Sequence, residues 1–358
     1  MSKQYKSIEQ RISLWKEFYK QSNERPLLGF FVGSEYPIHR YKAANTIPIG
    51  VELQPVHFDV DLYLDDFEAL FKAHEACGGD FIWSASAYWG IPWLEAVIGC
   101  PIVLSDYSSG SIHAEMPESF SRTKDIQSFS EDNPWVEKCI EFLEKSSLKS
   151  KGRWPIGTTR MRGISDLLST LYGAEELIMK MMGEPDEVHA IAKKLTNIFI
   201  EFGKIQHDHI PLFHDGIGSF YYNCWAPAGT LWHQEDATAL LSPEFYSEFI
   251  KPCDEEIVKA FKGCIMHQHS TGYVPTNEYL GMDFIALELH IDEGGPSAEE
   301  LFETHKIILE KKPLIIWGDI TREDMDWIYS KLSPEGLAVI TVVESQEEAA
   351  VIWERYNS

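Results

Sequence analysis

Two histidines one residue apart stand at the end of an apolar segment, residues 264–269, which reads CIMHQH. If this segment is a β-strand, side chains two positions apart lie on the same face, so His267 and His269 point in one direction. Imidazole is the commonest metal-binding side chain in proteins. The spacing of the pair therefore predicts a metal site at the end of this strand.

A second apolar segment, residues 284–290 (FIALELH), repeats the arrangement and ends with Glu288 and His290. Neighbouring strands lie about 4.8 Å apart, so the ends of two such strands can share one ion. His267, His269 and Glu288 form a set of two histidines and one carboxylate, which suits a catalytic zinc and equally a non-haem iron or manganese ion. The alternative is that the histidines form hydrogen bonds with loop backbone or with a neighbouring acid.

These two segments belong to a longer series of short apolar segments that alternate with helical ones. They show no regular alternation of apolar and polar residues, which is typical of parallel strands buried on both faces. The series predicts a (β/α)8 TIM barrel that forms a single domain over residues 1–358, with an N-terminal helical extension over residues 1–24 and elaborated loops after strands 1 and 2. The eight predicted strands are residues 27–32, 80–84, 154–158, 217–222, 264–269, 284–290, 313–317 and 337–343.

The helices between the strands are marked by apolar stripes and by capping residues. Asn133 followed by Pro134 predicts a helix start within the long segment between the second and third strands. Pro252 either kinks the helix that begins after Ser242 or starts a second one. The predicted helices cover residues 7–21, 65–77, 165–182, 184–207, 242–263 and 297–312, with further helices from 133, 321 and 345.

Two arginines, Arg160 and Arg162, follow the third predicted strand and share a face if the strand persists that far. The carboxyl ends of all strands of a TIM barrel face one mouth, where active sites lie. Guanidinium groups at this mouth would bind the carboxylates or phosphate of a substrate in a bidentate way. The alternative is pairing with resident acids such as Asp166 or Asp236, because the chain is rich in acids.

Four aromatic residues near the predicted strand ends are candidates for substrate binding: Tyr88, Trp89, Tyr222 and Trp225. Their rings could stack on a planar or macrocyclic ligand. The alternative is that they form the apolar core of long loops.

Three more polar residues stand at strand ends. His290 and Asp319 are candidate catalytic residues, with Asp319 as general acid or base or, equally, as the N-cap of the next helix. Glu344 is a candidate fourth metal ligand, or it stabilises the N-terminus of the last helix.

The charge of the chain limits its partners. It carries 31 Lys and Arg against 56 Asp and Glu, a net charge of -25, which disfavours nucleic acid and anionic membrane surfaces. No apolar run is long enough to span a bilayer and no apolar signal core follows the N-terminus, so we expect a cytoplasmic protein. The six cysteines form no CxxC pair, and we expect them to be free and mostly buried.

Four short segments resemble the uroporphyrinogen decarboxylase-like family of (β/α)8 enzymes, which includes corrinoid-dependent methyltransferases and is related to cobalamin-independent methionine synthase. The most specific of them is residues 241–252. The four segments are residues 78–80 (GGD), 95–101 (EAVIGCP), 162–168 (RGISDLL) and 241–252 (LSPEFYSEFIKP).

Within that family, the resemblance favours the methyltransferases. The arginine-rich signature of the decarboxylases is absent after the first strand, where the chain reads LGFFVGSE, and so is their late Gly-His-Gly. The methyltransferases bind zinc through His-x-Cys after strand five and a Cys after strand eight, and the methionine synthase relatives add a Glu after strand six. His267 and His269 match the first pair with His in place of Cys, Glu288 falls at the Glu, and Glu344 lies near the last Cys.

The resemblance implies a zinc-dependent methyltransferase that moves a methyl group between a corrinoid and a small acceptor. A His and Glu ligand set leaves a more Lewis-acidic ion than thiolates do, and such an ion suits water or an oxygen substrate. Two alternatives stay open: a decarboxylase (a carboxy-lyase) of a polycarboxylate such as uroporphyrinogen, and a non-catalytic corrinoid- or porphyrin-binding protein. The expected partners are a small anionic substrate, a separate corrinoid protein and, as an open alternative, a second copy of the chain in a homodimer.

Overall fold

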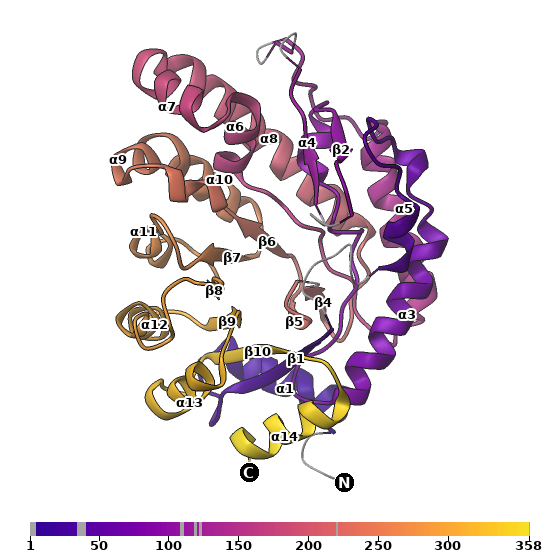
Figure 1. Cartoon of the computed structure of the whole chain (residues 1–358), viewed down its shortest axis with the longest axis vertical. Coiled ribbons are helices and arrows are strands. Elements are labelled where there is room, and N and C mark those ends of the chain that lie inside the picture. Colours follow the sequence, from indigo (N-terminus) through magenta and orange to yellow (C-terminus); the bar gives the residue numbers. More distant parts are fainter. Residues whose placement is uncertain are drawn as a thin grey trace.

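A parallel β-sheet lies at the centre of the protein, and helices surround it (Figure 1). The computed structural model describes residues 5–33, 41–107, 111–117, 120–121, 124–219 and 221–357. Within these residues, six strands form one parallel sheet in the order β1-β10-β9-β8-β7-β6. These strands are β1 (Leu27–Val32), β6 (Thr230–Gln234), β7 (Gly263–His269), β8 (Ala286–Ile291), β9 (Leu314–Gly318) and β10 (Leu337–Val343).

The strands of this sheet are buried almost throughout. In β9 every residue is buried, and in β1 only Val32 is partly exposed. Apolar side chains on both faces of each strand explain the burial, because the helices pack against the outer face while the inner faces pack against one another. The prediction of short parallel strands is confirmed for β1, β7, β8, β9 and β10, whereas β6 was not among the predicted strands.

The helices lie outside the sheet and begin where capping residues predict. Ser7 and Gln10 form a capping box at the start of α1, and the Asn133 side chain accepts a hydrogen bond from Trp135 N at the start of α5. Within the described residues, the α-helices of more than four residues are α1 (Ile8–Phe18), α3 (Val60–Cys77), α4 (Trp93–Val97), α5 (Pro134–Ser150), α6 (Ile164–Tyr172), α7 (Ala174–Gly183), α8 (Pro185–His209), α10 (Lys251–Ala260), α11 (Thr276–Leu280), α12 (Phe302–Leu309), α13 (Arg322–Lys331) and α14 (Gln346–Asn357).

The predicted second and third strands lie beside the sheet but form only isolated contacts. Asp80 N donates to Leu28 O at 2.9 Å, Ala85 forms a parallel bridge with Ile156, and Arg162 forms one with Gln234. These contacts connect β1 with β6 around the remaining side. The fold is therefore TIM-barrel-like, whereas eight regularly paired strands that close a barrel are not formed by the described residues.

The predicted fourth strand, residues 217–222, was wrong. β4 (Gly216–Ser219) and β5 (Cys224–Pro227) form an antiparallel hairpin, and Phe220 lies outside the described residues. The strand that pairs with β7 is β6, whose sequence is TLWHQ. Its buried polar residues do not resemble the apolar strands around it, so the sequence pattern points to the hairpin instead.

The long segment after the second predicted strand has the elaborated structure that was expected. It contains α4, the antiparallel hairpin of β2 (Ile102–Leu104) and β3 (Ile112–Ala114), and α5. The segment that follows β1 includes residues 34–40, which lie outside the described part of the chain.

The helix around Pro252 is divided in two. The Ser242 side chain caps α9 (Pro243–Phe245), a π-helical turn spans Tyr246–Ile250, and α10 follows. A proline lacks the N–H for a helical hydrogen bond, and the wider turn before it accommodates the interruption. In the described ranges, no helix is both long enough and apolar enough to cross a membrane.

Candidate metal centre

The register of three neighbouring strands brings the predicted ligands to one edge of the sheet. Gln234 of β6 lies opposite His267 of β7, and His267 lies opposite Glu288 of β8. His269 lies opposite His290 in the same ladder. The ends of these strands therefore meet, as the metal hypothesis requires.

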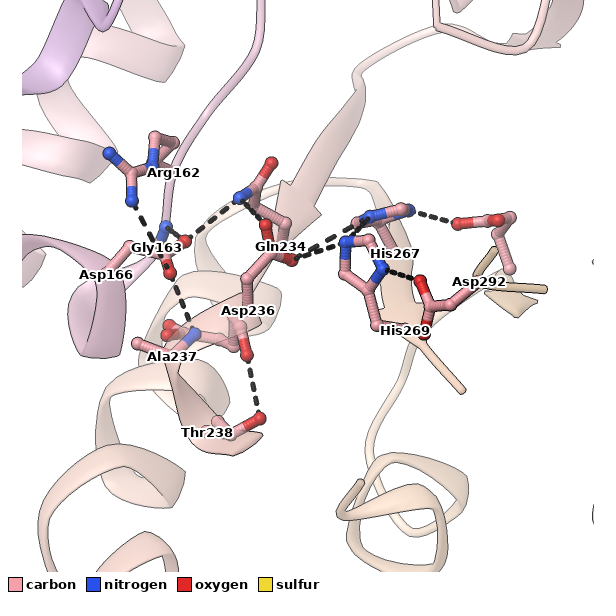
Figure 2. A network of polar contacts seen from close by, with 12 residues as sticks. Arg162, Gly163, Asp166, Gln234, Asp236, Ala237, Thr238, His267, His269 and Asp292 are labelled. Atoms are coloured by element: carbon pink, nitrogen blue, oxygen red, sulfur yellow. Dashed lines mark hydrogen bonds and ion pairs between the residues drawn. The ribbon is translucent and has the colours of Figure 1, made fainter. Parts of the chain in front are cut away.

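Three side-chain atoms converge at this edge (Figure 2). The Nε2 atoms of His267 and His269 lie 3.3 Å apart, and Oδ1 of Asp236 lies 3.7 Å from each of them. A point equidistant from these three atoms lies about 2.1 Å from each, which agrees with the length of zinc bonds to imidazole nitrogen and carboxylate oxygen. Asp236, His267 and His269 thus have the spacing of three ligands of one ion.

Glu288, a predicted ligand, lies on the other side of the His267 ring. It forms a short hydrogen bond with Nδ1 of His267, so it faces away from the converging Nε2 atoms. Tyr222 OH donates to Glu288 at 3.2 Å, and Trp232 Nε1 donates to Tyr222 OH at 2.7 Å. This buried chain of hydrogen bonds fixes the orientation of the His267 ring.

His269 has a similar carboxylate behind it. Its Nδ1 lies 2.5 Å from Oδ1 of Asp292, and Oδ2 of Asp292 accepts hydrogen bonds from the backbone and hydroxyl groups of Ser270 and Thr271. Burial raises the pKa of Asp292, but the bond to His269 outweighs it and holds this pKa well below its usual range. Carboxylate-bonded imidazoles of this kind are common among metal ligands, because the bond fixes the tautomer that leaves Nε2 free.

The carboxylate of Asp236 is held in place by Gln234 of β6, which also bonds Asp166 of α6. Gln234 Nε2 donates to Oδ2 of Asp236 at 2.6 Å and to Oδ2 of Asp166 at 3.1 Å, and Oδ1 of Asp166 accepts from Ala237 N at 2.9 Å (Figure 2). Oδ1 of Asp236 is buried and has no hydrogen-bond partner among the described residues. A buried carboxylate oxygen without a donor is costly, and a cation at the convergence point would satisfy it.

The two histidines differ in their affinity for protons. Burial lowers the pKa of His267 to about 4. For His269 burial acts in the same direction, but the bonds and charges of Asp292 and Asp236 outweigh it and raise the pKa to about 9. A metal ion would therefore have to displace a proton in order to bind His269.

The predicted arginines have different environments. Arg162 forms a short ion pair with the buried Glu95 and lies 3.9 Å from Asp166. It therefore pairs with acids of the chain itself, which was the alternative to binding a substrate. Arg160 lies over the ring of Trp89, at 5.9 Å from its centroid, and forms no ion pair with any described residue.

The four predicted aromatic residues separate into two pairs. The ring of Trp89 lies against that of Tyr221, with centroids 5.6 Å apart. Tyr222 donates a hydrogen bond to Glu288, which in turn bonds His267 of the candidate metal centre. Tyr88 packs in the loop core against Tyr63 at 4.6 Å, and Trp225 packs against Tyr19 next to the N-terminal helix.

His290 lies beside the cluster, whereas Asp319 and Glu344 do not join it. The His290 ring is 5.1 Å from that of His269 and 4.8 Å from that of Trp317, and its Nδ1 is buried without a described partner. Burial lowers the pKa of His290. Asp319 and Glu344 are exposed, and neither belongs to a group of closely spaced metal-binding side chains in the described ranges. The N-cap of α13 is Thr321, so Asp319 does not cap that helix.

Asp236, Asp292 and Tyr221 were not among the predicted site residues. Asp292 continues the alternation of Glu288 and His290, and this signal was available in the sequence. Asp236 follows β6, the strand that the sequence pattern missed.

A further buried polar cluster lies behind β6. His233 Nε2 lies 2.9 Å from Oδ1 of Asp254, and both oxygens of Glu235 accept hydrogen bonds, from Ile164 N and Ser165 N, each at 2.7 Å. Glu235 thus caps the N-terminus of α6, and its carboxylate is used in holding this helix against β6.

The chain is similar in structure, but not in sequence, to a known enzyme. No protein-family model and no curated protein sequence matches it, so its resemblance to the uroporphyrinogen decarboxylase-like family stays a prediction. A solved structure of a methyltransferase from Methanosarcina mazei matches 96% of this chain and 97% of its own, with a TM-score of 0.63 and 12% sequence identity. Along nearly its whole length, the chain therefore shares its fold with that structure.

Proposed function

We propose that the chain is a metal-dependent methyltransferase and that Asp236, His267 and His269 bind its divalent ion, zinc first. The observation that carries the proposal is the convergence of two carboxylate-bonded imidazoles on a buried carboxylate oxygen that has no described partner. The likeness in fold to a methyltransferase supports the reaction class. The ligand set revises the one expected from sequence, because Asp236 takes the place of Glu288 and Glu344.

The residues around the cluster prepare it for this role. Glu288 and Asp292 each hold an Nδ1, so that both Nε2 atoms face Asp236, and Gln234 directs the second oxygen of Asp236 away from them. When bound, zinc would act as a Lewis acid that lowers the pKa of a coordinated acceptor and makes it a better nucleophile. Nitrogen and oxygen ligands donate less charge than thiolates, which favours an oxygen acceptor.

The methyl donor that we propose is a corrinoid carried by a separate protein, as the sequence resemblance implies. A decarboxylase of a polycarboxylate would need several cationic anchors at the mouth. Of the two candidate arginines there, Arg162 is neutralised by Glu95. The methyltransferase is therefore the better-supported proposal.

Metal content is the first test. Protein purified without added metal is expected to contain about one equivalent of zinc or another divalent ion by elemental analysis. The variant His267→Ala should lose it, and His189→Ala, which removes a half-exposed histidine of α8, should retain it. Wild-type protein without stoichiometric metal, or a His267→Ala variant that keeps it, would contradict the proposed centre.

The reaction is tested with methylcobalamin as the donor and a panel of alcohols, phenols, thiols and amines as acceptors. Metal-dependent demethylation that is lost in His267→Ala is the expected result. Spectral evidence of cobalamin or porphyrin binding without turnover would favour the non-catalytic alternative, and release of carbon dioxide from a polycarboxylate would favour the decarboxylase.

A further inference from the structure

The two arginines at the mouth face the interior of the fold. The backbone N–H of Thr159 donates to Oε1 of Gln206 in α8 at 2.8 Å, and Nε2 of the same Gln206 side chain donates to the sulfur of Met161 at 3.2 Å. The Met161 side chain therefore points toward the helix layer. Arg160 and Arg162, which flank it in the chain, point to the opposite side.

The charge of Arg162 is used within the protein. Its partner Glu95 is fully buried, and Asp166 lies close by. Although burial lowers the pKa of Arg162, these carboxylates raise it above its usual range. Arg162 thus holds α4, which carries Glu95, against the start of α6, and its charge is already paired within the protein.

Arg160, in contrast to Arg162, is not paired with an acid in the described part of the chain. It forms no ion pair with any residue in the described ranges, and its Nε is buried without a hydrogen-bond partner. Burial and the charge of Arg162 lower its pKa. Although the charges of Glu95 and Asp236 act on it from a distance, a largely desolvated guanidinium without an ion-pair partner in contact is costly, and this cost is notable in a chain with a net charge of -25, where acids are abundant.

Aromatic rings connect Arg160 with the metal centre. The guanidinium lies over Trp89, the ring of Trp89 is 5.6 Å from that of Tyr221, and Tyr221 is 5.4 Å from the ring of His267. The cation and the proposed metal ligands are therefore two ends of one contiguous group of side chains, joined by flat apolar surfaces.

We propose that Arg160, with Trp89 and Tyr221, forms a binding site for a small, flat molecule that carries one carboxylate. A guanidinium binds a carboxylate through two parallel hydrogen bonds, and the aromatic rings pack against the body of the ligand. One unpaired arginine fits one carboxylate, which separates this ligand from a polycarboxylate. The use of this site to orient the methyl acceptor rests on the proposed function, whereas the binding itself does not.

The test is calorimetric titration with benzoate and with benzamide, its neutral isostere. Benzoate is expected to bind wild-type protein more tightly than benzamide does, and Arg160→Gln should weaken benzoate binding by about 10- to 100-fold without changing that of benzamide. Arg160→Lys, which keeps the charge but not the planar fork, should give an intermediate loss. The matched control is Arg153→Gln, which removes a half-exposed arginine that forms an ion pair with Glu68.

The same titrations in the His267→Ala background separate this site from the metal centre. A carboxylate that bound only the ion would lose its affinity in this variant, whereas one bound by Arg160 should keep it. The proposal is overturned if benzoate binds wild-type protein no better than benzamide, if Arg160→Gln binds it as wild type does, or if binding vanishes in His267→Ala. If the His267→Ala variant retains benzoate binding but wild-type protein contains no metal, the proposed function fails and this site stands.

Discussion

Asp236 is the residue on which the proposed metal centre depends, and the sequence alone points to it only as an acid that pairs with an arginine. His267 and His269 could be predicted because their spacing fixes a common face on any strand. Glu288 was correctly placed on the neighbouring strand, but its contact with Nδ1 of His267 follows from side-chain orientation, which spacing does not determine. Asp292 could have been predicted from the same spacing, because it lies two residues after His290 and so on the same face of the strand if it extends that far.

The contrast between Arg160 and Arg162 gives a prediction at this scale. Arg162→Gln leaves the Glu95 carboxylate buried without its counter-charge and is expected to lower the free energy of unfolding by about 3 kcal/mol. Arg160→Gln removes a charge that forms no ion pair with a described residue and should cause no such loss. Urea unfolding of both variants measures the difference, and equal losses would show that Arg160 has a structural role as well.

At the scale of elements, the site depends on how closely α6 approaches the end of β6. Glu235 caps α6, and the Gln234 side chain donates hydrogen bonds to both Asp166 and Asp236. Gly163, at the start of α6, lies against Gln234 and Glu235. Helices could be predicted here because capping residues and apolar stripes are local signals. β6 could not, because its buried polar residues serve the packing of several elements at once, and this tertiary role leaves no local pattern.

Gly163 tests this close approach. A Cβ at this position would lie 2.2 Å from the backbone oxygen of Gln234 and 2.2 Å from Oε1 of Glu235. Gly163→Ala is therefore expected to destabilise the protein by about 1–3 kcal/mol and to weaken metal binding, because β6 must shift and carry Asp236 with it. The control is Gly183→Ala at the end of α7, where no atom lies within 4 Å of the added Cβ and little change is expected. Unchanged metal binding in a destabilised Gly163→Ala would show that Asp236 is not positioned through this contact.

At the scale of the whole molecule, burial disfavours the protonated form of three histidines away from the site. Burial lowers the pKa of His74, His207 and His305 to about 4 each, and both ring nitrogens of His305 lack a described partner. In the unfolded chain these histidines are protonated below about pH 6.5, whereas in the folded chain they are protonated only near pH 4. Their contribution to the free energy of unfolding is therefore fully present above about pH 6.5 and is lost as the pH falls toward 4.

The expected loss between pH 7.5 and pH 5 is about 2 kcal/mol for each such histidine. Urea unfolding of wild-type protein and of His305→Leu at both pH values isolates one of them, since the remaining histidines are common to both proteins. The variant should lose less stability than wild type on acidification. An identical loss in the two proteins would show that His305 is protonated in the folded state.

The most direct test of the proposed centre is the zinc affinity of an Asp236 variant, measured by competition with a chromophoric chelator. Asp236→Ala is expected to weaken binding by about 100-fold or more, because it removes one of three ligands, while Asp132→Ala, at an exposed acid, should bind as wild type does. Wild-type affinity in Asp236→Ala, with a loss in Glu344→Ala instead, would contradict this account and restore the ligand set expected from the sequence.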